Sequence, residues 1–420
     1  MRKALFLALF WIGCLAADSF DWNPDLGEEE QNPLVPSGNT EAVILDGIDF
    51  ALDLFRVMEK GTEGNFAFSP YAISSAMGMV FNGAEGITQG EMVKAMRFKV
   101  RLWYLNEAFY WLSNRYAYRP QETGSDILLS VSNALWLQRG VTLKPEYQTI
   151  VEAFYLTPIR YSNFSLYPAV ARADINSWIR DRTKGRIPFI FEPKDLSLSP
   201  RMLMVSACYL RAKWANQFEP RVTRGTPFFP MPGRTIIVPT MVKTSIFSYL
   251  ETPEFSVVEL PYNSRKPGSK KLSMMILLPK ETFGLTKVLD KLTAEGFQSA
   301  LKLMQPAAVI VSIPKFSLNN SYTMNGMFSQ LGLTSLFKPE ANLKGMTEEA
   351  LYMNLFFHKC IVANDEAGSD AGNPYAVASP PVSGSIITNP ALFTADHPFL
   401  FAIVDVEAKT VLFMGRINHP

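Results

Sequence analysis

Histidine and cysteine, on which most enzyme active sites and metal centres depend, are scarce in this chain. Its 420 residues include only 3 of each. The sequence contains no His-Glu-x-x-His motif, no Cys-x-x-Cys pair, no glycine-rich phosphate loop and no Gly-x-Ser-x-Gly turn. A serine nucleophile would need His358 or His397 as its base, and a hydrogen-bonded core histidine on a strand explains His358 better. The sequence therefore predicts no enzyme, no catalytic residues, no cofactor and no metal centre.

A surplus of charge and a long apolar run are also missing. The 40 basic and 39 acidic side chains give a net charge of +1, whereas proteins that bind nucleic acid usually carry a large basic excess. Beyond residue 17, no stretch reaches the roughly eighteen unbroken apolar residues of a membrane helix. We therefore expect neither nucleic acid nor a membrane as a partner. Because 48% of the residues are hydrophobic, the chain can bury a large core.

The N-terminus has the three-part layout of a secretory signal peptide. Arg2 and Lys3 precede an apolar run that ends in small residues just before Asp18. We predict that residues 1–17 are removed and that the protein is secreted and extracellular; a buried N-terminal helix is the alternative interpretation. Residues 18–42 are acidic and rich in proline, glycine and asparagine, which predicts a flexible N-terminal arm.

Two Asn-x-Ser triplets could carry glycans if the chain is secreted. Asn163 and Asn319 each begin an Asn-x-Ser triplet, the acceptor for N-linked glycans. Such triplets also arise by chance, so each asparagine is a candidate glycosylation site with an unmodified surface asparagine as the alternative.

Hydrophobic periodicity predicts helices and strands throughout the remaining chain. Helices are expected at 44–58, 70–80 and 173–182, and strands at 127–138, 203–210, 256–260, 272–278, 351–364, 399–404 and 411–415. The pattern is that of a mixed α+β domain, with helices concentrated in the first half and strands in the second. No internal repeat is present.

A long stretch without regular periodicity follows the predicted strand at 351–364. Residues 372–392 contain no pattern that would pack, yet apolar strands resume directly afterwards. Compact domains rarely contain about twenty unstructured residues without a functional reason. We interpret this stretch as an exposed recognition or bait loop.

Several short motifs in a fixed order resemble the serpins, a family of serine protease inhibitors. They include Asn-Phe-Ala-Phe-Ser-Pro at 65–70, Asn-Gly-Ala-Glu-Gly at 82–86, Ser-Asn-Ala-Leu-Trp-Leu-Gln at 132–138, Leu-Arg-Ala-Lys-Trp at 210–214, Val-Glu-Leu-Pro-Tyr at 258–262, Ile-Pro-Lys-Phe at 313–316 and Asp-His-Pro-Phe-Leu-Phe at 396–401. The resemblance implies a single serpin-fold domain over residues 43–420, with three β-sheets, about nine helices and an exposed reactive loop. It also implies a monomer that presents residues 366–392 as bait to an extracellular serine protease.

In the family, the cleaved loop inserts as a new strand into the central sheet, which places physical requirements on its hinge. Six residues match the family hinge: Glu366, Ala367, Gly368, Ser369, Asp370 and Ala371. The run Gly372-Asn373-Pro374-Tyr375 then departs from it, because proline removes a ladder hydrogen bond and glycine and asparagine are poor strand formers. A non-inhibitory serpin is therefore the alternative: a carrier, storage or interaction protein, or a cleaved substrate.

The resemblance also implies a gate at which the central sheet opens. Its residues would be Ser69, Ser206, His358 and Trp214. Ser206 stands where the family usually has asparagine and Ala72 where it usually has serine, whereas His358 is kept.

Two cysteines remain after the signal peptide is removed, and the same comparison brings them together. If residues 206 and 358 face each other on parallel strands, Cys208 and Cys360 share a face, because each lies two residues further on. A disulfide there would prevent insertion. Two buried free thiols are the alternative, since such bridges need a particular geometry.

The bond that a protease would cleave is inferred from spacing. Counting forward from Gly368 with the spacing usual in the family places it at Val382-Ser383, and counting back from Pro398 places it between residues 384 and 387. No lysine or arginine lies between Ala367 and Phe393. The resemblance therefore favours an elastase-like or chymotrypsin-like protease as the partner.

Overall fold

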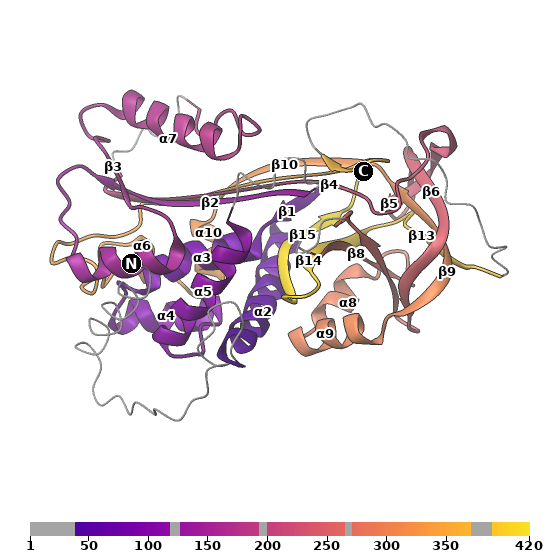
Figure 1. Ribbon diagram of the computed structural model, residues 1–420, viewed down its shortest axis with the longest axis horizontal. Helices are drawn as coiled ribbons and strands as arrows, with labels where there is room; N and C mark the ends of the chain where they lie inside the picture. The colour runs from indigo at the N-terminus through magenta and orange to yellow at the C-terminus, as the bar shows by residue number, and fades with distance from the viewer. Residues whose placement is uncertain (1–37, 118–126, 193–199, 265–270, 371–388) are drawn as a thin grey trace.

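The computed structural model describes residues 38–117, 127–192, 200–264, 271–370 and 389–420. Over these ranges the chain forms an α+β fold with nine α-helices, α2 to α10, as expected. Figure 1 shows a long central sheet with α7 (Pro168–Arg182) on one face and α3 (Pro70–Phe81) and α5 (Leu102–Tyr116) on the other. No helix in the described ranges combines the length and apolar composition needed to cross a membrane.

The central sheet has six strands and is built around β4 (Met202–Lys213). The strand order is β10-β11-β4-β2-β3, with β12 also paired to β4. The flanking strands are β10 (Phe316–Thr323), β11 (Leu355–Asn364), β2 (Ile127–Gln138), β3 (Arg160–Ser162) and β12 (Gly368–Asp370). The first nine residues of β4 are buried, because helices cover both faces of the sheet.

The second sheet has nine strands. Its order is β1-β15-β14-β8-β7-β6-β9-β13, with β5 paired to β6. The strands are β1 (Phe66–Phe68), β5 (Arg224–Met231), β6 (Arg234–Glu251), β7 (Phe255–Pro261), β8 (Leu272–Pro279), β9 (Gln305–Pro314), β13 (Ala391–Thr394), β14 (Phe399–Asp405) and β15 (Thr410–Ile417). The three sheets expected form two hydrogen-bonded networks among the described residues, because the 18-residue β6 pairs with β5, β9 and β7 in turn.

The helices predicted at 44–58, 70–80 and 173–182 are all found, and tertiary packing extends each of them. Besides α3, α5 and α7, the helices are α2 (Gly38–Gly61), α4 (Gly86–Met96), α6 (Pro145–Tyr155), α8 (Leu285–Lys291), α9 (Ala294–Leu303) and α10 (Asn325–Gln330). Helices α6, α8 and α9 were not predicted. Helix α2 begins inside the range 18–42, earlier than the predicted flexible arm allows, because Thr40 and Val43 already lie on its buried face. In α3 all twelve residues are buried, and the Ser69 hydroxyl caps the helix by accepting a hydrogen bond from the Ala72 amide.

Strand boundaries show where periodicity succeeds and where it fails. The strand predicted at 127–138 is found with the same limits. Strand β11 begins at Leu355 rather than at 351, because the residues before it bond irregularly: the Asn354 amide donates to the Met202 carbonyl. The predicted loop 366–392 is too long at both ends, because β12 and β13 each pair with a strand of a sheet.

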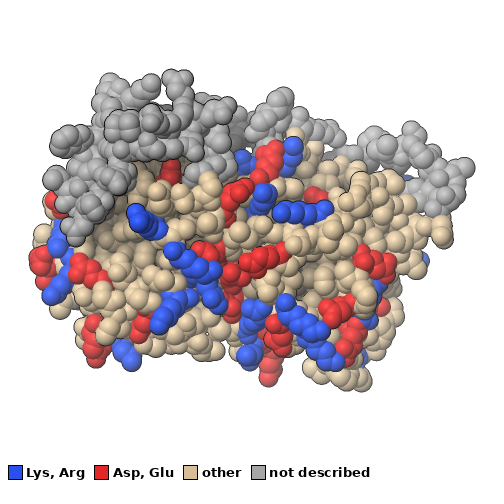
Figure 2. All heavy atoms as spheres, turned by 90° about the horizontal axis from the view of Figure 1, so that it is seen from below, with Lys and Arg blue, Asp and Glu red and all other residues tan. Residues whose placement is uncertain are grey.

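Charged side chains are mixed over the surface. Figure 2 shows basic and acidic groups interspersed on one face of the molecule. That face therefore carries no large patch of a single sign, in keeping with the net charge of +1.

Candidate functional site: the hinge and gate of the central sheet

The hinge begins with a tight turn that the Asp365 side chain holds in place. Its Oδ1 accepts hydrogen bonds from the amides of Ala367 (2.8 Å) and Gly368 (3.0 Å), and the Asp365 amide donates to the Gly368 carbonyl at 2.9 Å. Aspartate favours such turns because its short carboxylate reaches the backbone two residues ahead. Burial raises the pKa of Asp365 despite these bonds. The turn reverses the chain immediately after β11.

Gly368 is required at this turn. Its φ is +153°, and an added Cβ would lie 2.0 Å from the Ala212 carbonyl oxygen and 2.6 Å from the Lys213 Cα. Both contacts are with backbone atoms that cannot rotate away. A side chain at this position is therefore incompatible with the observed hinge.

The first hinge residues already form a strand against β4. In β12, Gly368, Ser369 and Asp370 pair antiparallel with Lys213, Ala212 and Arg211. Strand β11 pairs with β4 only as far as Ile361, opposite Tyr209. Strand β12 therefore lies along the part of β4 beyond its pairing with β11.

A buried hydrogen bond fixes the middle of β12. The Ser369 side chain is fully buried, and its Oγ lies 2.7 Å from the Tyr262 hydroxyl. Burial raises the pKa of Tyr262 well above its ordinary value, so the phenol stays protonated and can donate. Tyr262 in turn stacks on Trp214 with ring centroids 4.6 Å apart.

Glu366 ties the turn to neighbouring elements. Its Oε2 lies 2.7 Å from Lys315 Nζ, and its Oε1 accepts a hydrogen bond from the Thr223 hydroxyl at 2.8 Å. Burial alone would raise the pKa of Glu366, but these bonds outweigh it and hold that pKa below the ordinary value. The sequence does not reveal these partners, because they lie far along the chain.

Three of the four predicted gate residues lie together in the middle of the sheet. His358 on β11 is the register partner of Ser206 on β4, and its Nδ1 lies 3.1 Å from the Ser206 hydroxyl. Its Nε2 lies 3.1 Å from the Ser69 amide. An amide can only donate, so Nε2 accepts, Nδ1 carries the proton and His358 is neutral. The gate thus links both strands to the start of α3.

Trp214, the fourth predicted gate residue, lies at the hinge instead. Its amide donates to the Ala367 carbonyl and its indole nitrogen to the Asp365 carbonyl, both at 2.9 Å. It follows the end of β4, eight residues beyond Ser206, or roughly 26 Å along an extended chain.

The gate contains a residue that sequence reasoning missed: Asn133 on β2, whose Nδ2 donates to the Ala72 carbonyl at 2.9 Å. Its place in the 132–138 motif was the available signal.

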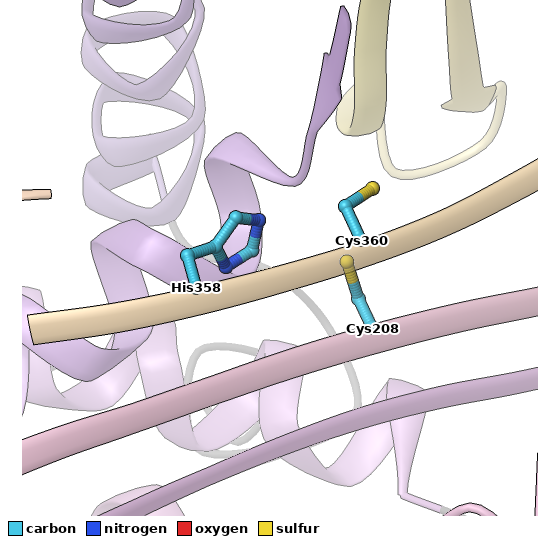
Figure 3. Close-up of side chains that lie close together, drawn as sticks. All are labelled: Cys208, His358 and Cys360. Carbon is cyan, nitrogen blue, oxygen red and sulfur yellow. The ribbon is translucent and has the colours of Figure 1, made fainter. Parts of the chain in front are cut away.

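The two cysteines are direct neighbours across β4 and β11. Cys208 and Cys360 are register partners, both fully buried and both free thiols. Figure 3 shows them on the same face of the strands as His358. Burial raises the pKa of Cys208, but the hydrogen bond from the Cys360 thiol opposes burial, and the net effect is a lowered pKa. Burial and the neighbouring Cys208 together raise the pKa of Cys360.

The remaining predicted sites lie elsewhere. Asn319 is exposed on β10, and Asn163 is half-buried, with its Oδ1 accepting from the Gln138 side chain and the Leu166 amide. Several predictions fall outside the described residues: the signal peptide, the arm up to residue 37, Ala371, the run 372–375, and the candidate scissile pair Val382 and Ser383.

Comparisons with known proteins agree with this geometry. Residues 47–420 match the family described as "Serpin (serine protease inhibitor)". An uncharacterized serpin-like protein of Thermococcus kodakarensis is 33% identical over 398 residues, covering 94% of this chain and 88% of the relative. The leukocyte elastase inhibitor of Bos taurus is 31% identical, covering 88% of this chain and 97% of that protein. The crystal structure of maspin is similar with a TM-score of 0.81 at 26% identity, covering 91% of this chain and all of maspin. The chain belongs to the serpin family, a family of non-enzymatic inhibitors.

Proposed function

We propose that this chain is a secreted inhibitor of extracellular serine proteases with elastase-like or chymotrypsin-like preference. The observation that carries the proposal is β12, in which the start of the hinge is already paired with β4. Relatives about 30% identical are named as leukocyte elastase inhibitors. The absence of lysine and arginine between Ala367 and Phe393 supports a protease that does not require a basic residue.

Insertion would extend β12 along β4. The pairing of Gly368 with Lys213 sets a register in which Asn373 would face Cys208 and Pro374 would face Ala207. Seven residue pairs between β11 and β4 would separate, and the new strand would pair with both. The central sheet gains a strand, and a protease attached to the cleaved loop is carried along with it.

The same register supports the alternative of a non-inhibitory serpin. Asn373 would enter the face that contains Cys208, where an unpaired polar group costs about 1–3 kcal/mol. Pro374 would remove one ladder bond, worth about 0.5–1.5 kcal/mol net. Slow insertion would let the protease hydrolyse the loop and leave, so the chain would act as a substrate.

Covalent trapping distinguishes the two functions. Elastase, chymotrypsin and subtilisin are each incubated with the full chain, and the products are separated on denaturing gels. A complex that survives denaturation, together with a large rise in melting temperature after loop cleavage, supports inhibition. Cleavage without a complex and without that rise would refute it.

The hinge itself can be tested with a matched pair of variants. Replacing Asn373 and Pro374 by alanine should increase the fraction of protease trapped per cleavage, because both obstacles to insertion are removed. The chain offers a second Asn-Pro pair at Asn389 and Pro390, beyond every candidate scissile bond. The same two substitutions there should leave that fraction unchanged, since this side of the loop does not insert.

Secretion is tested separately. Residues 1–17 support it, and cleavage after Ala16 or Ala17 would give a mature protein that begins at residue 17 or 18. Expression of the full sequence in a secreting cell line, followed by N-terminal analysis of the protein in the medium, checks this. Retention of Met1 inside the cell would contradict it.

A further inference from the structure

Three soft ligand groups meet between the strands that must separate for insertion. The Sγ atoms of Cys208 and Cys360 and one ring nitrogen of His358 all lie within 4.8 Å of one another. All three residues are fully buried. Figure 3 shows that two of them project from β11 and one from β4, toward the same side. The family resemblance already predicted that Cys208 and Cys360 share a face two residues beyond the pair 206 and 358, and the observed register of the two parallel strands places His358 beside them.

The geometry is close to that of a metal site. Zinc binds thiolate sulfur at about 2.3 Å and imidazole nitrogen at about 2.0–2.1 Å. In a tetrahedral site these lengths place two sulfurs about 3.8 Å apart, and a sulfur and a nitrogen about 3.5 Å apart. Atoms already within 4.8 Å of one another need to approach by about 1.3 Å at most.

The chemistry of the donors selects the cation. Two thiolates and an imidazole favour thiophilic cations, and calcium and magnesium prefer oxygen ligands. Two thiolates also neutralise a divalent cation, which avoids burying a net charge. Because Nε2 of His358 accepts from the Ser69 amide, it has the lone pair, and Nδ1–H can keep its hydrogen bond to Ser206, the outer-shell contact that ligating histidines usually make. Nε2 would exchange the Ser69 amide for the metal.

We propose that Cys208, His358 and Cys360 form a Zn²⁺ site that holds β4 and β11 together. The fourth position, which the cluster does not fill, takes water or a hydroxyl oxygen. The site exists only while the two strands are neighbours. Insertion of the loop would raise their separation from about 4.8 Å to about 9.6 Å. Two sulfurs on one zinc ion can be at most about 4.6 Å apart.

Zinc binding and loop insertion are therefore mutually exclusive. Zinc stabilises the uninserted form and opposes insertion, and insertion expels zinc, as reciprocal coupling requires. The coupling to insertion rests on the proposed function, whereas metal binding by the uncleaved chain does not.

Cobalt(II) reports the site directly, since thiolate ligands give it a charge-transfer absorption. The reduced, metal-free full chain should bind one Co²⁺ with that absorption, and Zn²⁺ should displace it. Cys360→Ala should weaken binding by more than about 100-fold, beyond the 10- to 100-fold typical of outer-shell changes. The control is Val362→Ala, which shortens a side chain two residues further along the same buried face of β11. This variant should bind Co²⁺ as tightly as the wild type does. Zn²⁺ should raise the melting temperature of the uncleaved wild type in proportion to the logarithm of its free concentration.

Several outcomes would overturn the site. The first is the absence of the thiolate-to-cobalt absorption in the wild type, and the second is an undiminished absorption in Cys360→Ala. The third is a protein mass, measured without reductant, that is two hydrogens below the mass of the dithiol form. The last result would show that a disulfide occupies both sulfurs.

The cleaved chain tests the coupling. If cleavage raises the melting temperature, the inserted form should no longer bind Co²⁺, and continued binding would refute mutual exclusion. If cleavage does not raise the melting temperature, the loop does not insert and the proposed inhibitory function is refuted. Cobalt binding by the uncleaved chain then still decides whether the metal site exists.

Discussion

Replacing Gly368 by alanine tests whether the hinge depends on the geometry observed. The new Cβ would lie 2.0 Å from the Ala212 carbonyl oxygen, whereas ordinary contact begins at 3.4 Å. The other close atoms, Lys213 Cα and Ala212 C, also belong to the backbone of β4, which pairs at Ala212 with Ile127 of β2 on its other side. The hinge, rather than β4, therefore has to move, and β12 should separate from it.

The cost follows from the contacts that would be lost. Releasing β12 gives up one or two backbone hydrogen bonds to β4 and the buried bond between Ser369 and Tyr262. At about 0.5–1.5 kcal/mol net each, the loss of these two or three bonds is about 1–4.5 kcal/mol. Keeping the pairing would instead require a strained φ and a clash, at about 1–3 kcal/mol for the dihedral angle alone.

Two amides report on the hinge in a hydrogen-exchange experiment. The Trp214 amide donates to the Ala367 carbonyl and the Phe218 amide donates to the Glu366 carbonyl. A loss of about 1–4.5 kcal/mol should speed their exchange by about 5- to 2,000-fold. Gly326→Ala is the control, because its Cβ would meet nothing within 4 Å. Unchanged exchange at both amides in Gly368→Ala would refute the reasoning.

Three further substitutions probe the charges and hydrogen bonds of the fold. Arg115→Gln should lower the free energy of unfolding by about 3–5 kcal/mol in urea titrations, because Asp405 is fully buried and Arg115 lies 2.6 Å from it; a loss under about 1 kcal/mol would contradict this. Tyr262→Phe should cost about 1–3 kcal/mol by leaving the Ser369 hydroxyl without its partner, and a neutral effect would show that water replaces the phenol. The pKa of Glu366 is lowered from 4.5, so its ionised form stabilises the fold above that pH and the contribution is lost as pH falls through the lower folded value. Glu366→Gln should therefore unfold more easily than the wild type at about pH 7 and equally at about pH 2; equal stability at both pH values would contradict this.

Local signals in the sequence were sufficient for the fold and for part of the site. Alternation of side chains marked the strand at 127–138 with its observed limits, and the order of the motifs indicated the family. The hinge turn was not predicted, although Asp365 and Gly368 are residues whose own chemistry favours a reversal. These features depend on neighbours a few residues apart, which a sequence shows directly.

Other parts of the site depend on contacts between distant segments. The partner of Glu366 is Lys315, and Trp214 belongs to the hinge rather than the gate because it packs on Tyr262. Hydrophobic periodicity could not show that β6 would merge two of the three expected sheets into one, because that depends on which strands pair with β6.

The sequence by itself determined the class of fold, the family and the composition of a loop that begins as a serpin hinge and continues with residues poorly suited to a strand. Tertiary structure decided that β12 already pairs with β4 and that His358 meets two cysteines across the gate. The physical reason is that side-chain periodicity and turn chemistry are local, whereas strand register is set by the packing of the whole sheet. A shift of one residue in that register would turn Cys208 away from Cys360, and no pattern within either strand alone specifies it.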